Sequence, residues 1–366
     1  MGLKVGIVGL PNAGKSTIFN ALTKSKIAAE NYPFCTIDPN VGIVNVPDKR
    51  LDQLSKIFKP KNIINTIIEF VDIAGLVKGA SKGEGLGNQF LSHIRDVDAI
   101  VYVIRLFKDD NVSHVEGSID PLRDIEIIET ELILKDIILV EKHIKKIEKL
   151  SKTGDKEAQA TEALLKNILK EMNNGMPINT ISISPEETKL IKHLSFLTEK
   201  PMLYLANIDD NEIINEVENS EIQLLQQHAN KNNSEIITIC GNLEYEISLL
   251  QEEEKTLFLK EFNLQEPGLN KLIKAAYKIL GLKTFFTAGE KEVRAWTIRD
   301  GMSAQESAGV IHSDIERGFI KAETYSINEI IDYQSEIKLK EAGKMRQEGK
   351  NYIVEDGDVI FFKFNV

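Results

Sequence analysis

Two hydrophobic patterns alternate along the first third of the chain and predict an α/β fold. Short runs of branched apolar residues have the length and composition of buried strands, and segments with apolar residues at helical spacing follow them. The runs span residues 4–8, 67–72 and 99–105, and two more come later at 201–206 and 235–240. Strands that alternate with helices favour a parallel sheet covered by helices.

Between the third and fourth runs the pattern becomes a long helical one. Apolar residues spaced by 4, 3, 4 and 3 positions form the seam of a short coiled coil; they are Ile133, Ile137, Val140, Ile144 and Ile147. Residues 151–155 interrupt the seam, and helical spacing returns at 164–172. We therefore expect an antiparallel helical hairpin inserted into the α/β domain.

The last part of the chain predicts a separate small module. Residues 293–298 are strand-like, 303–317 are helix-like, and 351–354 and 359–364 are strand-like on either side of a turn. A strand, a helix and further strands within so short a stretch are typical of an α+β module.

The composition of the chain limits the cellular compartment and the kinds of partner that we expect. The 366 residues suffice for two or three domains, and 42% hydrophobic with 28% charged residues is ordinary for a globular protein. The net charge of −11 argues against a general nucleic-acid coat, so RNA contact would need a local basic patch. Two cysteines, Cys35 and Cys240, favour a reducing cytoplasm. We expect no signal peptide, because residues 1–3 lead directly into a strand, and no membrane span, because no apolar run approaches about 18 residues.

A glycine-rich motif with a lysine and a serine follows the first apolar run. Gly9, Gly14, Lys15 and Ser16 match the pattern Gly-x4-Gly-Lys-Ser/Thr. A strand, a glycine loop and a helix N-terminus direct N–H groups and the helix dipole at one point, which suits a polyphosphate. We expect Lys15 to reach the β- and γ-phosphates and Ser16 to bind Mg²⁺. The predicted nucleotide contacts here are Asn12, Ala13, Gly14, Lys15, Ser16 and Thr17.

Two further positions are candidates for the γ-phosphate end of the site. Asp72 ends the run at 67–72, and Gly75 follows three positions later. We expect Asp72 to hold Mg²⁺ through water and the Gly75 amide to contact the γ-phosphate. Thr36 lies in a polar loop 21 residues after Lys15, where P-loop hydrolases often carry a threonine that closes over the phosphate and the metal. An ordinary loop threonine is the alternative.

The residue after Gly75 changes the expected mechanism. Many GTPases carry a glutamine there to orient the attacking water, whereas this chain has Leu76, which cannot hydrogen-bond through its side chain. Hydrolysis is therefore slow, or another group positions the water. His114 is the candidate, and a surface histidine is the alternative. The glycines within 79–87 predict a switch loop ordered by the γ-phosphate.

A base-binding end is predicted after the run at 201–206, where the sequence is Asn207, Ile208, Asp209, Asp210. Guanine-specific P-loop proteins use Asn-Lys-x-Asp here, with the aspartate accepting hydrogen bonds from guanine. Ile208 replaces the lysine and Asp210 retains the acid, so the local chemistry leaves the base open. Residues 240–242 are expected to form a loop under the base.

Basic residues gather in two places. On the expected hairpin they are Lys142, Lys145, Lys146, Lys149, Lys152 and Lys156, and before the last strands they are Lys338, Lys340, Lys344, Arg346 and Lys350. Each group is either a docking surface for RNA or a solvated face.

With these motifs placed, the chain resembles the YchF/Obg-like ATPase family, TRAFAC-class P-loop proteins, from end to end. The resemblance is carried by Gly-Leu-Pro-Asn-Ala-Gly-Lys-Ser at 9–16, Asn-Tyr-Pro-Phe-Cys-Thr at 31–36, Asp-Ile-Ala-Gly-Leu-Val-Lys-Gly-Ala at 72–80, Gly-Glu-Gly-Leu-Gly-Asn at 83–88 and, near the C-terminus, Ala-Gly-Lys-Met-Arg and Asp-Gly-Asp-Val. It implies an OBG-type P-loop domain at 1–121 and 200–282, an inserted antiparallel coiled-coil hairpin at 122–199, and a β-grasp, ubiquitin-like TGS domain at 283–366.

The resemblance also implies a function. It implies Mg²⁺-dependent hydrolysis of ATP in preference to GTP, association with the ribosome and its RNA through the hairpin and the TGS domain, and a role in regulating translation or stress responses. His114 falls at the family's proposed assisting histidine, and Asn12 resembles the asparagine that ligates a stimulating K⁺ in related enzymes. Asp210 replaces a family glutamate, while Ile208 fits the family's main-chain reading of adenine. We expect a cytoplasmic monomer.

Two other functions stay open. One is a GTPase of the Obg-related class, which comparison of ATP and GTP binding would distinguish. The other is a non-catalytic scaffold in which nucleotide gates binding to the ribosome or to RNA. A Lys15→Ala variant that lost nucleotide but still pelleted with ribosomes would favour the scaffold.

Overall fold

The structure is a computed structural model that describes residues 3–24, 40–73, 86–109, 118–214, 220–232 and 234–365. The chain forms two units. The first comprises Met1–Ile43 and Glu69–Leu272, and the second comprises Val44–Ile68 and Ile273–Val366. The segment 44–68 thus belongs with the C-terminal part of the chain, which the sequence patterns did not indicate. The three-domain division drawn from the resemblance stays a prediction.

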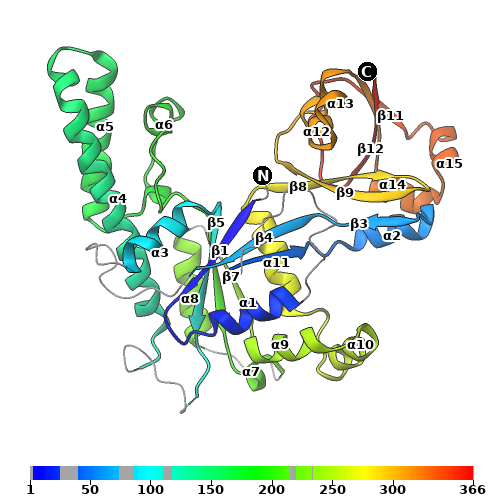
Figure 1. Ribbon diagram of the computed structural model, residues 1–366, viewed down its shortest axis with the longest axis horizontal. Helices are drawn as coiled ribbons and strands as arrows, with labels where there is room; N and C mark the ends of the chain where they lie inside the picture. Colours follow the sequence, from blue (N-terminus) through cyan, green and yellow to red (C-terminus); the bar gives the residue numbers. More distant parts are fainter. Residues whose placement is uncertain are drawn as a thin grey trace. The chain divides into compact units, whose positions relative to one another are not determined.

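The first unit is built on a six-stranded sheet (Figure 1). Its strands are β1 (Lys4–Gly9), β2 (Val41–Asn45), β4 (Ile67–Asp72), β5 (Ala99–Arg105), β6 (Met202–Asn207) and β7 (Glu235–Ile239). They lie in the order β2-β4-β1-β5-β6-β7, and all neighbouring pairs from β4 to β7 are parallel. The five predicted strands are therefore confirmed, with bounds that differ by at most one residue at either end.

Helices cover both faces of this sheet. The unit contains α1 (Lys15–Lys24), α3 (Leu86–Arg95), α7 (Asp210–Ile214), α8 (Ser220–Lys231), α9 (Gly241–Leu249) and α10 (Glu252–Glu261), and α11 (Gly268–Ile279) passes from it into the second unit after Leu272. On one face, Leu91 of α3 and Leu225 of α8 pack into an apolar core with Tyr102 of β5. On the other side α1 packs against β1 and α9 (Figure 1). Every residue of β5 is buried, as expected for a central parallel strand.

Two long helices extend from this unit: α4 (Pro121–Lys152) and α5 (Lys156–Asn173), the pair drawn in green at the left of Figure 1. Asp155 begins α5 by accepting a hydrogen bond from Ala158 N. The seam residues predicted on α4 lie in one apolar cluster with Leu165 and Ile168 of α5. Beyond α5, a single 3₁₀ turn (Ile178–Thr180) and α6 (Pro185–Ile191) lead the chain back to the sheet.

The second unit holds another six-stranded sheet. Its strands are β3 (Asn62–Ile64), β8 (Leu282–Ala288), β9 (Glu292–Arg299), β10 (Phe319–Ser326), β11 (Arg346–Glu348) and β12 (Asp358–Phe364). They lie in the order β11-β10-β12-β8-β9-β3. β8 and β9 form an antiparallel hairpin, while β12 is parallel to β8 and antiparallel to β10.

The helices of the second unit pack on both faces of its sheet. They are α2 (Lys49–Phe58), α12 (Ala304–Ile311), α13 (Ser313–Arg317), α14 (Ile327–Tyr333) and α15 (Glu336–Glu341). Because side chains alternate along a strand, the adjacent Phe285 and Phe286 serve different cores. Phe285 packs with Ala304 and Ala308 of α12, and Phe286 packs with Leu51 and Leu54 of α2.

Two predictions for this unit are wrong in detail. The expected helix at 303–317 is two helices, because His312 is extended (φ −164°) and begins α13 by accepting a hydrogen bond from Asp314 N. The expected strand at 351–354 is an isolated bridge between Ile353 and Ser303, and the short strand beside β10 is β11 instead. None of the described helices combines the length and the apolar character that crossing a bilayer requires.

Candidate functional site

The predicted phosphate loop joins β1 to α1. The loop is tightened by a hydrogen bond from Ala13 N to Leu10 O (3.3 Å), and α1 follows with Ile18 N donating to Gly14 O (3.1 Å). Asn12 and Gly14 both have positive φ, +66° and +91°. At Gly14 a Cβ atom would lie 2.2 Å from Asn207 Nδ2, so this position requires glycine for space as well as for backbone conformation.

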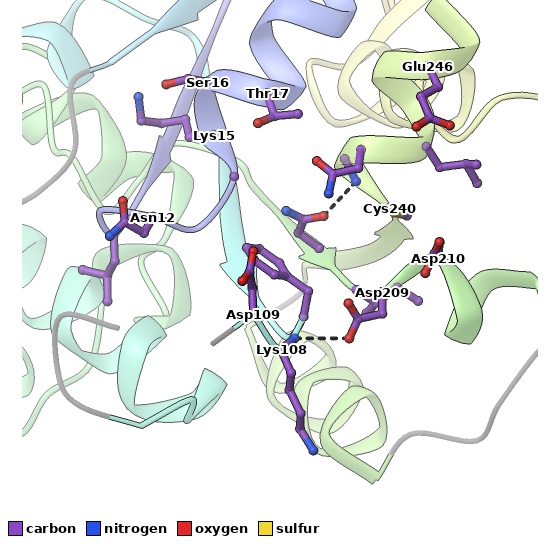
Figure 2. A pocket seen from close by; sticks show the side chains of 18 of the residues that line it. Asn12, Lys15, Ser16, Thr17, Lys108, Asp109, Asp209, Asp210, Cys240 and Glu246 are labelled. Carbon is purple, nitrogen blue, oxygen red and sulfur yellow. Dashed lines mark hydrogen bonds between the residues drawn. The ribbon is translucent and has the colours of Figure 1, made fainter. Parts of the chain in front are cut away.

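A cavity of about 870 Å³ opens beside this loop. It is lined by the ends of several strands and the starts of two helices, as parallel α/β sheets arrange their ligand sites. Its lining residues are Leu10, Pro11, Asn12, Gly14, Lys15, Ser16, Thr17, Phe107, Lys108, Asp109, Asn207, Ile208, Asp209, Asp210, Cys240, Gly241, Asn242, Leu243 and Glu246. Figure 2 shows Lys15, Ser16 and Thr17 at the start of α1, apart from Asp209 and Asp210.

The cavity has opposite charges at its two ends. Lys15 and the N-terminus of α1 make one end positive, whereas Asp209, Asp210 and Glu246 line the other. A ligand with an anionic tail and a neutral, hydrogen-bonding head therefore fits in one direction, with its tail at α1.

Lys15 and Asp72 form an ion pair at the positive end. The Lys15 Nζ lies 2.5 Å from Asp72 Oδ1, and the two side chains are 12% and 21% exposed. The sheet topology explains this contact. Asp72 ends β4, which lies parallel to β1 with Asp72 opposite Ile7, and Lys15 begins the helix that follows β1. The structure thus brings together two residues that the sequence assigned to one site.

Asn207 connects the phosphate loop to the loop under the expected base. Its side chain is buried; Nδ2 donates to Ala13 O (3.0 Å) and Oδ1 accepts from Gly241 N (2.9 Å). Its carbonyl oxygen accepts from Leu106 N and Phe107 N. The Asn207 side chain therefore joins two loops of the cavity, and its backbone carbonyl holds the third.

The three residues after Asn207 differ in burial and in hydrogen-bond partners. Ile208 is buried in the apolar core of the sheet, and its N–H donates to Ile239 O (2.9 Å). Asp209 accepts from Lys108 N (3.2 Å), which fixes the loop after β5. Asp210 is exposed at the first position of α7, and its Oδ1 accepts from Asn211 N (2.8 Å).

Phe107 and Cys240 also line the cavity. The Arg105 guanidinium lies 4.5 Å from the centre of the Phe107 ring and its Nε donates to Phe107 O. Sequence reasoning missed Phe107, although its place at the carboxyl end of β5 was a usable signal. Cys240 lies in the loop predicted under the base; burial raises the pKa of its thiol.

Three predicted residues lie outside the described part of the chain: Thr36, Gly75 and His114, together with Leu76. Their roles stay predictions. Ala13 is buried and does not line the cavity; its carbonyl oxygen accepts the hydrogen bond from Asn207.

Comparisons with known proteins agree with this architecture. A family model described as "50S ribosome-binding GTPase" matches residues 4–143, and one described as a protein of unknown function matches residues 282–365. "Ribosome-binding ATPase YchF" of Bacillus subtilis is 52% identical over 366 residues, and all of both chains is covered. The chain belongs to the YchF family. The protein of the same name from Escherichia coli O157:H7 is also 52% identical over the full length.

Solved structures extend the family match to the fold. The Schizosaccharomyces pombe YchF GTPase is 39% identical, covers 99% of this chain and 98% of its own, and superposes with a TM-score of 0.89. A GTP-binding protein from Pyrococcus horikoshii, 18% identical with a TM-score of 0.61, shares the fold. The chain therefore has the P-loop GTPase-type α/β fold of the YchF family, with a second mixed sheet.

Proposed function

We propose that this protein is a Mg²⁺-dependent nucleoside triphosphatase that binds ATP, hydrolyses it slowly to ADP and phosphate, and acts at the ribosome. The observation that carries the proposal is Lys15 at the start of α1, beside Asp72 and at the positive end of a large cavity. Relatives 52% identical over their whole length are named ribosome-binding ATPases, which supports the same activity and partner here.

The phosphate end suits a triphosphate chain. The loop from Asn12 to Gly14 and the first turn of α1 offer backbone N–H groups, and Lys15 supplies a positive charge. Ser16 and Thr17 add hydroxyl groups to the same wall of the cavity. These residues bind and orient the phosphates, and they stabilise the negative charge that shifts onto phosphate oxygens during hydrolysis.

Mg²⁺ fits the donors present at this end. Mg²⁺ prefers oxygen ligands, and the Ser16 hydroxyl and Thr36 are the proposed direct ones. The Asp72 carboxylate, which Lys15 holds at the phosphate loop, is proposed to support the ion through water. When bound, the ion neutralises charge on the phosphate oxygens. Asn12, which lines the cavity, is proposed as a K⁺ ligand on the resemblance described above.

The base end suits a purine. The Phe107 ring offers a stacking surface, and the Arg105 guanidinium beside it fixes its position. The Ile208 N–H donates its hydrogen bond to Ile239 O, so it is not available to a base. The Ile208 carbonyl oxygen is the backbone atom that remains, and a carbonyl can accept a hydrogen bond from the adenine amino group. This supports ATP. Asp210, exposed at the cavity, is the acid that guanine recognition would use, and it supports GTP as the second candidate.

Water activation is proposed to involve His114, because Leu76 cannot hydrogen-bond. The Gly75 amide is proposed to contact the γ-phosphate in the same region. A steady-state hydrolysis assay of His114→Ala tests this part. We expect a fall in kcat with unchanged ATP affinity, and an unchanged kcat would remove His114 from the mechanism.

The helical pair α4–α5 and the C-terminal module are the proposed contacts with ribosomal RNA. The hairpin lysines predicted to form a basic surface are all exposed. We interpret α4–α5 as the inserted antiparallel coiled coil, and the hairpin of β8 and β9 with α12, β10 and β12 as the β-grasp TGS domain. A ribosome-binding role also supports a cytoplasmic protein, which we propose to be a monomer.

Competition binding with ATP and GTP at equal concentrations, with Mg²⁺, tests the choice of nucleotide. We expect ATP to displace a labelled nucleotide at the lower concentration. Preference for GTP by tenfold or more would make the protein a GTPase of the same fold.

A further inference from the structure

Two histidines that do not line the nucleotide cavity face each other beside the helical pair α4–α5. His143 lies on α4, and His193 lies in the turn after α6. Their Nε2 atoms are 3.2 Å apart, and the ring centres are 4.8 Å apart with planes inclined by 50°. His193 is exposed and His143 is half-buried, so solvent reaches the pair.

Both backbones are held in place. Ile191 and Leu194, on either side of His193, are buried in the apolar cluster that includes Val140 of α4. Asp136, two helical turns before His143, accepts hydrogen bonds from Leu197 N and Thr198 N, both 2.9 Å, and from Thr198 Oγ1 at 2.7 Å. The packing and these bonds fix the turn against α4, so the backbones that carry the two imidazoles stay close to one another.

The separation of the nitrogens suits a shared metal ion. Imidazole nitrogens bound to one tetrahedral Zn²⁺ at about 2.0–2.1 Å lie about 3.3 Å apart, close to the 3.2 Å observed. Nε2 is a usual ligand atom of histidine, and imidazole suits Zn²⁺, Cu²⁺ and Ni²⁺, whereas Mg²⁺ prefers oxygen. A simple hydrogen bond between the rings would have a similar length, and the experiment below distinguishes the two.

We propose that His143 and His193 form a binding site for a divalent transition-metal ion of the Zn²⁺, Ni²⁺ or Cu²⁺ class, which ties α4 to the turn after α6. Water completes the coordination, because within the described ranges no three His, Cys, Asp or Glu side chains gather as a metal site. Lys146, one turn after His143, acts on it electrostatically and opposes a cation. The site is therefore weaker than a structural zinc site with four protein ligands.

The test is calorimetric titration of Zn²⁺ and of Ni²⁺ into untagged, metal-stripped full-length protein without nucleotide. We expect one equivalent of Zn²⁺ or Ni²⁺ to bind, and we expect its affinity to be the same with and without excess Mg²⁺. His143→Gln and His193→Gln should each lower the affinity for the ion by about tenfold or more, because each variant removes one of the two imidazole ligands. The matched control is His93→Gln, an exposed histidine on α3, and it should bind as the wild type does.

Two further measurements separate a site from a folding effect. His193→Cys supplies a different zinc ligand and should keep Zn²⁺ binding that His193→Gln loses. Bound Zn²⁺ should slow amide hydrogen exchange at residues 189–200 in the wild type, and not in His143→Gln. Equal binding in wild type and both glutamine variants, or no binding by the wild type, would show that the pair is a hydrogen bond and overturn the proposal.

Discussion

Lys15 Nζ and Asp72 Oδ1 lie 2.5 Å apart, although 57 residues separate them in the chain. A triphosphate that binds at α1 needs the same ammonium group, so it must share Lys15 with Asp72 or take it over. Asp72 has a second proposed task, which is to support Mg²⁺. We therefore expect the pair to couple the binding of phosphate by Lys15 to the release of the Asp72 carboxylate toward Mg²⁺.

Asp72→Asn tests this coupling. The amide keeps an oxygen at the end of β4 but removes the charge that competes for Lys15. We expect MgATP hydrolysis to fall by about tenfold or more, while ADP binding in EDTA stays the same or tightens. Asp52→Asn, an exposed carboxylate on α2, is the control. Loss of ADP binding in EDTA, or unchanged hydrolysis, would contradict the coupling.

Asn207→Ala should damage both stability and affinity. It leaves Ala13 O and Gly241 N without their partner in a buried place, which costs about 1–3 kcal/mol of unfolding free energy. ATP affinity should fall by about tenfold or more, because the two loops lose their connection. The measurements are urea unfolding and ATP titration. Asn230→Ala, at an exposed position of α8 that does not line the cavity, should change little; an equal loss there would show that Asn207 has no special role.

Phe107→Ala should weaken ATP and GTP alike. A purine that stacks on the ring loses about 1–3 kcal/mol of binding, so the Kd should rise by about tenfold or more. Phe107→Tyr keeps the ring and should bind nearly as the wild type does. Inhibition by inorganic tripolyphosphate, which has no base, should be unchanged. If the variant bound tripolyphosphate more weakly to the same extent as ATP, Phe107 would be acting through the phosphate loop.

Cys240 should report occupancy of the cavity. Burial raises the pKa of this thiol, so at pH 7.5 it holds less reactive thiolate than a free cysteine does, and raising the pH to 9 should speed its alkylation. MgATP should slow the reaction further by covering the cavity. Iodoacetamide labelling, followed by peptide mass spectrometry to separate Cys240 from Cys35, measures both effects. A rate equal to that of free cysteine, or one unaffected by ATP, would contradict this placement.

The strands and much of the site followed from the sequence because parallel sheets collect strand ends at one edge. Asp72 and Asn207 each end an apolar run, and Lys15 begins the helix after another. A strand end can be read from a change in hydrophobic pattern, so the positions of these residues were predictable. Their partners were not: Asn207 bonds to Ala13, 194 residues away, and no local pattern encodes that contact.

The second unit was harder to predict for a related reason. Residues 44–68 belong to it, because Leu51 and Leu54 of α2 complete the core beneath Phe286. An amphipathic helix shows that it has an apolar face but not which sheet receives it. At 351–354 the apolar residues suggested a strand, yet these residues pair by a single bridge, since β11 takes the place beside β10.

Titration calorimetry of the purified protein with ATP and Mg²⁺ shows whether a triphosphate binds at the start of α1. We predict saturable binding of one ATP per chain, lost in Lys15→Ala, while Lys24→Ala at the far end of the same helix binds as the wild type does. Absence of a binding signal with both ATP and GTP would contradict a triphosphate site at the start of α1.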